Sequence, residues 1–323
     1  MLNPKENALE VLNWGHPEYV PLTSVCNPMM ISLAVMTEEP FFGGKDCYGV
    51  NWELNSSGAI PAHDRPIYES ITDWESFLHL PDPDSFDFKA AAEFDLRGVD
   101  RDKQLVNIMY PCGLFERMVT FLGFENTLCD LVMEPEASKD YMYEVGKFKA
   151  AVIERAIDAY KPDMVTYADD MATARAPFMS MDVYREVIKP AHRLIADAIT
   201  GKDVIFCQHI CGKAEDFMPD LIDMGCKMWS SAQTMNDIKA VQEKYRGKLV
   251  IEGGWDTAGR PGQVDSSIEE CMEEALRCIR EYGPGMGYFC WPVIMGASGD
   301  TFQLDPRLTK IIEEWDSISH IYG

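Results

Sequence analysis

The chain has 323 residues, 46% of them hydrophobic, and a formal net charge of −24. This charge argues against a nucleic-acid partner, and no apolar run of about 18 residues is present to span a membrane. The first residues lack the pattern of a secretory signal, and ten cysteines without a CxxC pair indicate reduced thiols, so we expect a cytoplasmic protein, with a composition suited to anaerobic conditions.

The first 100 residues are irregular and contain loop-like segments at residues 40–44 and 81–84. They are predicted to form an N-terminal cap or elaboration. From residue 104 onward, short apolar runs alternate with segments of helical periodicity. The predicted strands lie at residues 104–109, 164–168, 203–209, 227–230, 249–252 and 288–291. The predicted helices lie at residues 113–133, 135–160, 182–199, 213–224, 236–245, 267–282 and 306–321.

Repeated strand–helix units with continuous apolar strands predict a parallel sheet that is buried on both faces. No GxGxxG or P-loop pattern supports a nucleotide-binding fold. The fold class is therefore predicted as an α/β (β/α)₈ TIM-type barrel with an irregular N-terminal cap. We expect residues 1–323 to form a single domain, in which residues 101–323 supply most of the barrel.

Polar side chains follow the predicted strands at the points where the strands end. They are Asp169, Asp170, His209, Cys211, Glu252, Trp255, Asp256 and Cys290. In a barrel of this kind these positions converge on the C-terminal face, which holds the active site.

The His209-x-Cys211 pair is the strongest indication of chemistry. Residues two apart on an extended strand point to the same side, so the imidazole and the thiolate would reach one point. Cys290 can complete a three-ligand site with an open fourth position, which is the arrangement of catalytic zinc. Each residue alone has a simpler explanation, because an isolated cysteine is usually a small buried apolar side chain.

The carboxylates allow structural explanations as well. Asp169 or Asp170 can cap a helix N-terminus, and Asp256 can form a turn with the next residues. Glu252 stands at the end of an apolar strand, where a carboxylate needs a partner. It is predicted to be a metal ligand or a group that supports a ligand.

Five segments together resemble the uroporphyrinogen decarboxylase superfamily, and within it the zinc-dependent, corrinoid-linked methyltransferases. They are Asp46-Cys47-Tyr48-Gly49-Val50-Asn51-Trp52, Pro111-Cys112-Gly113-Leu114-Phe115-Glu116, Tyr167-Ala168-Asp169-Asp170-Met171, His209-Ile210-Cys211-Gly212 and Glu252-Gly253-Gly254-Trp255-Asp256. The resemblance runs through nearly the whole chain. It implies a TIM-type barrel, in agreement with the element order.

Two departures separate the branches of this superfamily. Uroporphyrinogen decarboxylases carry arginines near the N-terminus that bind the acidic substrate, whereas residues 21–28 contain none. The methyltransferase branch carries a His-x-Cys pair and a distant cysteine as zinc ligands, which here would be His209, Cys211 and Cys290. In that branch the last cysteine usually follows a glycine, whereas Cys290 follows Phe289.

The resemblance implies transfer of a methyl group between a corrinoid and a small donor or acceptor, such as a thiol, tetrahydrofolate or a methyl ether. The corrinoid would arrive on a partner protein, since the chain lacks an Asp-x-His-x-x-Gly carrier signature. Asp170 or Glu252 would take the fourth zinc position or handle a proton, with Asp169 beside them, and Trp255 and Asp256 would contact the cofactor.

A homodimer is possible at the family level. Two alternatives remain open: decarboxylation of a smaller acid, and a non-catalytic or zinc-free barrel that binds a tetrapyrrole or a corrinoid partner.

Overall fold

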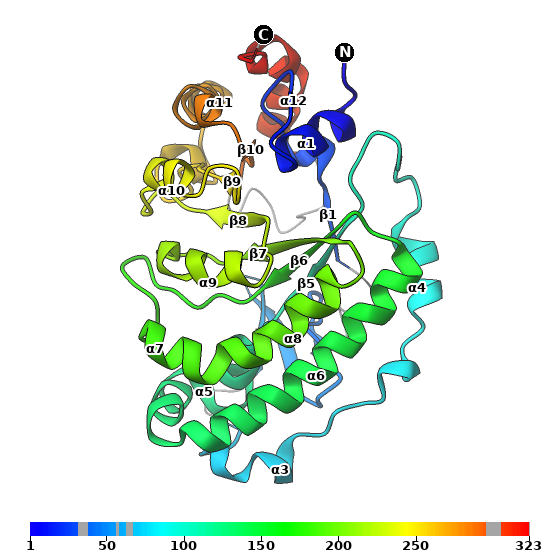
Figure 1. Ribbon diagram of the computed structural model, residues 1–323, viewed down its shortest axis with the longest axis vertical. Coiled ribbons are helices and arrows are strands. Elements are labelled where there is room, and N and C mark those ends of the chain that lie inside the picture. The colour runs from blue at the N-terminus through cyan, green and yellow to red at the C-terminus, as the bar shows by residue number, and fades with distance from the viewer. Residues whose placement is uncertain (32–37, 56–57, 63–66, 295–304, 323) are drawn as a thin grey trace.

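The computed structural model describes residues 1–31, 38–55, 58–62, 67–294 and 305–322. Its centre is a parallel sheet of seven strands (Figure 1). In spatial order the strands are β1 (Met29–Ile31), β5 (Asn107–Tyr110), β6 (Met164–Ala168), β7 (Ile205–His209), β8 (Met228–Ala232), β9 (Val250–Gly253) and β10 (Tyr288–Cys290).

The two outer strands of this sheet are linked by one N-terminal segment. Leu22 forms a parallel bridge with Cys290, whose N–H donates to the carbonyl of Pro21 at 2.9 Å. The same segment continues into β1, which pairs with β5 at the other edge. The sheet therefore curls toward itself, and the fold class is the α/β TIM-type barrel that the sequence predicts.

Helices connect the strands and cover the outside of the sheet. They are α5 (Leu114–Met133), α6 (Pro135–Tyr160), α7 (Met181–Val183), α8 (Lys189–Thr200), α9 (Met218–Asp223), α10 (Ile238–Lys244), α11 (Ile268–Tyr282) and α12 (Pro306–Ser319). In Figure 1, α6 and α8 run side by side across the lower part of the molecule, and the two chain termini lie together at the top.

Local sequence explains several helix boundaries. Ser267 and Glu270 form a capping box that begins α11, and Ser180 caps the helical stretch that continues through α8. Between α7 and α8, residues Tyr184–Ile188 form a π-helical turn. Pro190, two residues beyond this turn, has no N–H to donate, which explains why the regular hydrogen-bond ladder shifts there.

An apolar layer seals the N-terminal end of the barrel interior. It combines side chains of α1 (Pro4–Leu12) with side chains from the starts of the strands. The buried members of this cluster are Ala8, Val11, Leu12, Cys26, Leu105, Met164, Cys207, Met228, Val250 and Phe289. Access to the interior is therefore expected from the opposite, C-terminal face.

The N-terminal elaboration includes an antiparallel sheet of β2 (Gly44–Lys45), β3 (Asn51–Asn55) and β4 (Gly58–Pro61). It also includes three short helices: α2 (Thr23–Cys26), α3 (Trp74–Phe77) and α4 (Phe88–Asp95).

The buried carboxylate of Asp46 organises this small sheet. It accepts hydrogen bonds from the N–H groups of Tyr48 and Val50, from the indole of Trp52 at 2.9 Å and from Arg117 of α5 at 2.7 Å. The Asp-x-Tyr-Gly-Val-x-Trp segment is thus a structural motif.

A second buried ion pair joins the same segment to α6. Lys149 contacts the carboxylate of Glu38 and donates to the carbonyl of Cys112 at 2.8 Å. The Glu38 carboxylate also accepts from the hydroxyl of Tyr48, and its backbone carbonyl accepts from Arg117. These contacts fix Glu38 near the C-terminal end of β5.

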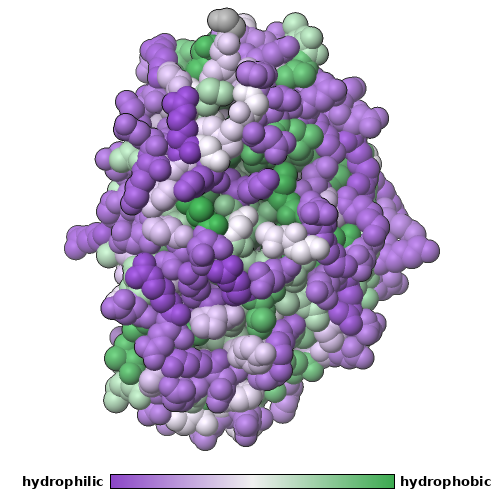
Figure 2. All heavy atoms as spheres, in the orientation of Figure 1, coloured by the Kyte–Doolittle hydropathy of each residue, from purple (hydrophilic) through white to green (hydrophobic). Residues whose placement is uncertain are grey.

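Hydrophilic side chains cover most of the face shown in Figure 2, and apolar atoms appear in smaller separate groups. Among the described residues, no helix combines the length and apolar character needed to cross a lipid bilayer.

Candidate metal centre and active site

Three potential metal ligands meet at the ends of two neighbouring strands. β6 and β7 pair in parallel with Ala168 opposite His209, so the residues that follow each strand emerge side by side. One ligand atom each from Asp170, His209 and Cys211 lies within 4.8 Å of the others. The structure therefore brings together two predicted zinc ligands and one predicted carboxylate.

The spacing of the His209 and Cys211 donor atoms fits a zinc ion. Donors bound at Zn–N and Zn–S lengths of about 2.0 and 2.3 Å on a tetrahedral centre lie about 3.5 Å apart. The distance between Nε2 of His209 and Sγ of Cys211 is 3.5 Å. A nitrogen, a sulfur and a carboxylate oxygen are all ligand types that zinc accepts, and three protein ligands leave a fourth position for substrate.

The loop that carries Cys211 is held against the loop that follows β6. The Asp170 Oδ1 atom accepts the N–H of Cys211 at 2.7 Å. Gly212 has a φ of +82°, and a Cβ there would lie 2.5 Å from the carbonyl oxygen of Ala172. The close approach of the two loops thus requires glycine directly after Cys211.

A bulge in β8 turns two consecutive serines toward this site. The register between β8 and β9 shifts between Trp229 and Ala232, and Ser231 has a φ of +64°. Successive side chains on a regular strand alternate between the two faces, and a bulge breaks that alternation. Ser230 Oγ therefore lies 3.3 Å from His209 Nδ1, while Ser231 Oγ lies 3.2 Å from Cys211 Sγ.

Burial favours the uncharged forms of the His209 imidazole and the Cys211 thiol. Desolvation lowers the pKa of His209, against the opposing effect of the Asp170 carboxylate. Desolvation, followed by the charge of Asp170, raises the pKa of the Cys211 thiol to about 12. The neutral imidazole is ready to bind a metal, whereas the thiol needs a cation to become a thiolate near neutral pH.

Two further acids act electrostatically on the same region, and the sequence did not single them out. Burial raises the pKa of Glu39 to about 7, and the carboxylate of Asp170 adds to the effect. Burial and the charges of Asp169 and Asp170 raise the pKa of Glu116 well above its ordinary value. Glu116 belongs to a segment that resembles the superfamily, whereas no sequence signal marked Glu39.

Asp169 stabilises the start of helix α5. Its carboxylate accepts the N–H groups of Phe115 and Glu116, both at 3.1 Å, and so caps α5. A Cβ on Gly113 would lie 2.1 Å from the Asp169 carboxyl carbon, so only glycine allows this approach. Burial raises the pKa of Asp169 to about 7. The helix-cap explanation thus applies to Asp169, while Asp170 faces the ligand group.

Cys290 does not join the metal-binding group, in contrast to its predicted role as third ligand. In β10, Phe289 lies opposite Glu252, and its side chain belongs to the barrel interior. Cys290 therefore points to the outer face, where its thiol contacts Cys278 of α11. Trp291 lies two residues after Phe289 and therefore points to the same inner face. It reaches the site instead, and the centre of its ring lies 5.9 Å from that of His209.

Glu252 lies inside the barrel below the ligand group. Its Oε1 accepts from the hydroxyl of Thr23 at 2.7 Å and from the amide of Asn27 at 3.2 Å. Glu252 is therefore placed to support a ligand, as one of its two predicted roles requires, and it is not among the three potential ligands. The side chain of Asp256 accepts the N–H of Gly259 in a turn, and Trp255 is buried in the core.

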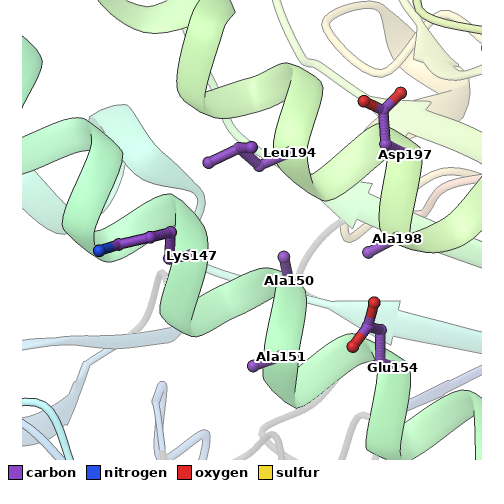
Figure 3. Close-up of a pocket in the computed structure, with 7 residues that line it drawn as sticks. All are labelled: Lys147, Ala150, Ala151, Glu154, Leu194, Asp197 and Ala198. Atoms are coloured by element: carbon purple, nitrogen blue, oxygen red, sulfur yellow. The ribbon is translucent and has the colours of Figure 1, made fainter.

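A surface depression between α6 and α8 is separate from this site (Figure 3). Its lining residues are Lys147, Ala150, Ala151, Glu154, Leu194, Asp197 and Ala198. It lies on the outer helical layer, away from the strand ends that carry the ligand group.

The architecture and the donor set define a TIM-type α/β barrel with a group of N, S and O donors that could hold a metal at its C-terminal face. The chain belongs to the uroporphyrinogen decarboxylase family, whose model matches residues 47–291. The family predicted from the sequence motifs is thereby confirmed.

Two similar proteins come from Methanosarcina mazei. The first is a methylated-thiol–coenzyme M methyltransferase, which is 22% identical over 84% of this chain and 81% of that protein. The second is the solved structure of a methyltransferase, with a TM-score of 0.66 and 12% identity over 98% of this chain and 99% of that one. Because the identity in the second comparison is only 12%, that similarity shows a shared fold.

Proposed function

We propose that this protein is a zinc-dependent methyltransferase. It would move a methyl group between a corrinoid, carried on a partner protein, and a small donor or acceptor such as a thiol, tetrahydrofolate or a methyl ether. One observation carries the proposal: ligand atoms of His209, Cys211 and Asp170 lie within 4.8 Å of one another, and the His209–Cys211 distance of 3.5 Å is that of two ligands on tetrahedral zinc. The similarity to a methylated-thiol–coenzyme M methyltransferase supports methyl transfer as the reaction.

In this proposal His209 Nε2, Cys211 Sγ and a carboxylate oxygen of Asp170 hold the metal. Bound zinc would supply a Lewis acid for the heteroatom that gains or loses the methyl group. The Asp170 carboxylate has a second task, because its Oδ1 atom also fixes the N–H of Cys211. Trp291 lies against the His209 ring and would help to exclude water from that side.

A thiol or hydroxyl substrate also has a proton to transfer. Glu39 and Glu116 lie close enough to Asp170 to interact with it electrostatically, and the pKa of each carboxyl is raised. A carboxyl with a pKa of about 7, such as Glu39, can accept or return a proton near neutral pH. We therefore assign proton transfer to Glu39 in preference to Asp169, which caps a helix.

The family match also makes decarboxylation a candidate. Against it stands the segment of residues 21–28, which has no arginine to bind an acidic substrate. In the structure this segment presents Thr23 and Asn27 to the buried carboxylate of Glu252. The polar side chains of this segment thus bind a carboxylate of the protein itself and not that of a substrate. We therefore rank decarboxylation of a small acid second.

Metal analysis of purified variants tests the zinc site. We expect about one zinc per chain in the wild type and loss of zinc in His209→Ala and Cys211→Ala. Cys290→Ala should retain zinc because its thiol points to the outer face, and the exposed Cys129→Ala is the matched control. Full zinc retention in both ligand variants would refute the site, and loss in Cys290→Ala would restore the sequence-based ligand set.

The reaction is tested with methylcobalamin, free or on a carrier protein, against a panel of thiols and tetrahydrofolate. Demethylation, followed by the change in the cobalamin absorption spectrum, should fall by orders of magnitude when zinc is removed. Release of carbon dioxide from uroporphyrinogen without any change at cobalt would favour the decarboxylase instead.

A further inference from the structure

The His209 ring is held between two side chains. Its Nε2 atom faces Cys211 Sγ at 3.5 Å, and its Nδ1 atom faces Ser230 Oγ at 3.3 Å. A neutral imidazole has one N–H and one lone pair, and only the nitrogen with the lone pair can bind a metal. Whichever group controls the proton at Nδ1 therefore controls whether Nε2 can act as a ligand.

Behind Ser230 lies the carboxylate of Glu252, on the neighbouring strand β9. Glu252 is fully buried, which raises the pKa of its carboxyl, and hydrogen bonds from Ser230, Thr23 and Asn27 oppose that rise. Thr23 and Asn27 both donate to Oε1. The Oε2 atom has no hydrogen bond with any residue in the described part of the chain. A buried carboxylate oxygen without a donor is costly, and Ser230 offers the hydroxyl proton nearby.

We propose that Glu252 is a positioning residue that acts through Ser230 to set the tautomer of His209. In its ionised form the Glu252 carboxylate can only accept hydrogen bonds, so the Ser230 hydroxyl then donates to it. Its oxygen then accepts the Nδ1–H of His209, which leaves the lone pair of Nε2 directed at the metal position. The inference deepens the proposed zinc site and rests on it for the role of Nε2.

Two features agree with this direction. Metal-binding histidines usually donate their second ring N–H to a carboxylate, a carbonyl or water, which fixes the tautomer. On the other side of the ring, the Cys211 thiol lies 3.5 Å from Nε2 and can donate to it while no metal is bound. The bulge at Ser231 makes room for the arrangement, because it lets Ser230 face the ring while Ser231 faces the thiol.

Two substitutions test the chain of hydrogen bonds from Glu252 through Ser230 to His209. One reverses the direction of these bonds, and the other removes them. In Glu252→Gln the amide NH₂ would take the place of Oε2 and donate to Ser230. The Ser230 hydroxyl would then donate to Nδ1, and the proton of the ring would move to Nε2, where it competes with the metal. Ser230→Ala removes the link and leaves Nδ1 without a partner. We therefore expect Glu252→Gln to weaken zinc binding more than Ser230→Ala.

The control is Thr166→Val. Thr166 is another buried hydroxyl of the barrel interior, on strand β6, and it donates to Asn107 at 2.9 Å. Ser230→Thr keeps a hydroxyl and serves as the rescue variant. Circular dichroism and thermal unfolding establish that each variant is folded.

The first readout is zinc affinity, measured by competition with a chelating chromophore. We expect losses of about 10- to 100-fold in Glu252→Gln and about tenfold in Ser230→Ala, with Ser230→Thr and Thr166→Val close to the wild type. The second readout is the tautomer of His209 in metal-free protein, from nitrogen-15 NMR of the imidazole rings assigned with His209→Ala. The wild type should carry the proton on Nδ1, and Glu252→Gln should carry it on Nε2.

The inference is overturned if the metal-free wild type carries the proton on Nε2. It is also overturned if the wild type binds zinc and Glu252→Gln and Ser230→Ala both bind zinc as tightly as the wild type does. A wild type that binds no zinc would refute the proposed function instead, and the NMR measurement would still decide the role of Glu252.

Discussion

Asp46→Asn should destabilise the protein strongly although Asp46 lies outside the metal-binding group. The amide oxygen of asparagine can still accept the N–H groups of Tyr48 and Val50. Its NH₂ group would replace Oδ2 and face two other donors, the indole of Trp52 and the guanidinium of Arg117. Because Arg117 is fully buried, it would lose the nearest carboxylate that balances its charge.

Removal of one partner from a buried ion pair costs about 3 to 5 kcal/mol, a large share of the 5–15 kcal/mol that typically stabilises a folded protein. Urea unfolding followed by circular dichroism measures the loss, and the exposed Glu53→Gln on the adjoining strand β3 is the control. Zinc content per folded molecule should stay unchanged. A loss below about 1 kcal/mol would show that the Asp-x-Tyr-Gly-Val-x-Trp segment does not organise the N-terminal sheet.

Burial lowers the pKa of His192 to about 4 from its ordinary 6.5, so the unfolded chain binds this proton more readily than the folded one. Stability should therefore fall as the pH decreases from 6.5 toward 4, by about 2 to 3 kcal/mol at pH 4.5, and urea titrations should show a shallower fall in His192→Gln but not in His320→Gln. Because Ser231 has a φ of +64°, Ser231→Gly should be about 1 kcal/mol more stable than Ser231→Ala in thermal unfolding, and equal stabilities would contradict the bulge. Zinc binding must remove the proton of the Cys211 thiol, whose pKa is raised to about 12, so the affinity in chelator competition should rise about tenfold per pH unit near neutrality, and a flat profile would exclude thiolate ligation.

The strand–helix order was predictable from residue 104 onward because each element there is continuous and apolar enough to show its period. Strand β6 and helix α6 lie where the sequence places them, and α8 differs mainly by the π-helical turn before Pro190. The first 100 residues gave weaker signals. There the structure depends on the buried charges of Asp46 and Glu38, whose partners lie on distant helices.

The candidate site was predictable only where a local rule decides the geometry. His209 and Cys211 lie two residues apart, and the end of a strand brings both to one side. Cys290 needed the register of β10 against β9 to decide which face it occupies, and sequence alone does not supply that register. Ser230 and Ser231 could not both be assigned to the site, because alternation puts consecutive residues on opposite faces until a bulge intervenes.

The charges around the site argue against a substrate with many carboxylates. The cations that act on Glu39 are Arg117 and Lys149, and both are buried in ion pairs with carboxylates of the protein itself. The charged side chains that act on Asp170 include the acids Glu39 and Glu116, so a substrate with many carboxylates would meet repulsion where it needs positive charge. The proposed zinc ion would supply positive charge at a single point. The same acids would then favour the metal and leave room for a small neutral substrate that brings a thiol or a methylated heteroatom to it.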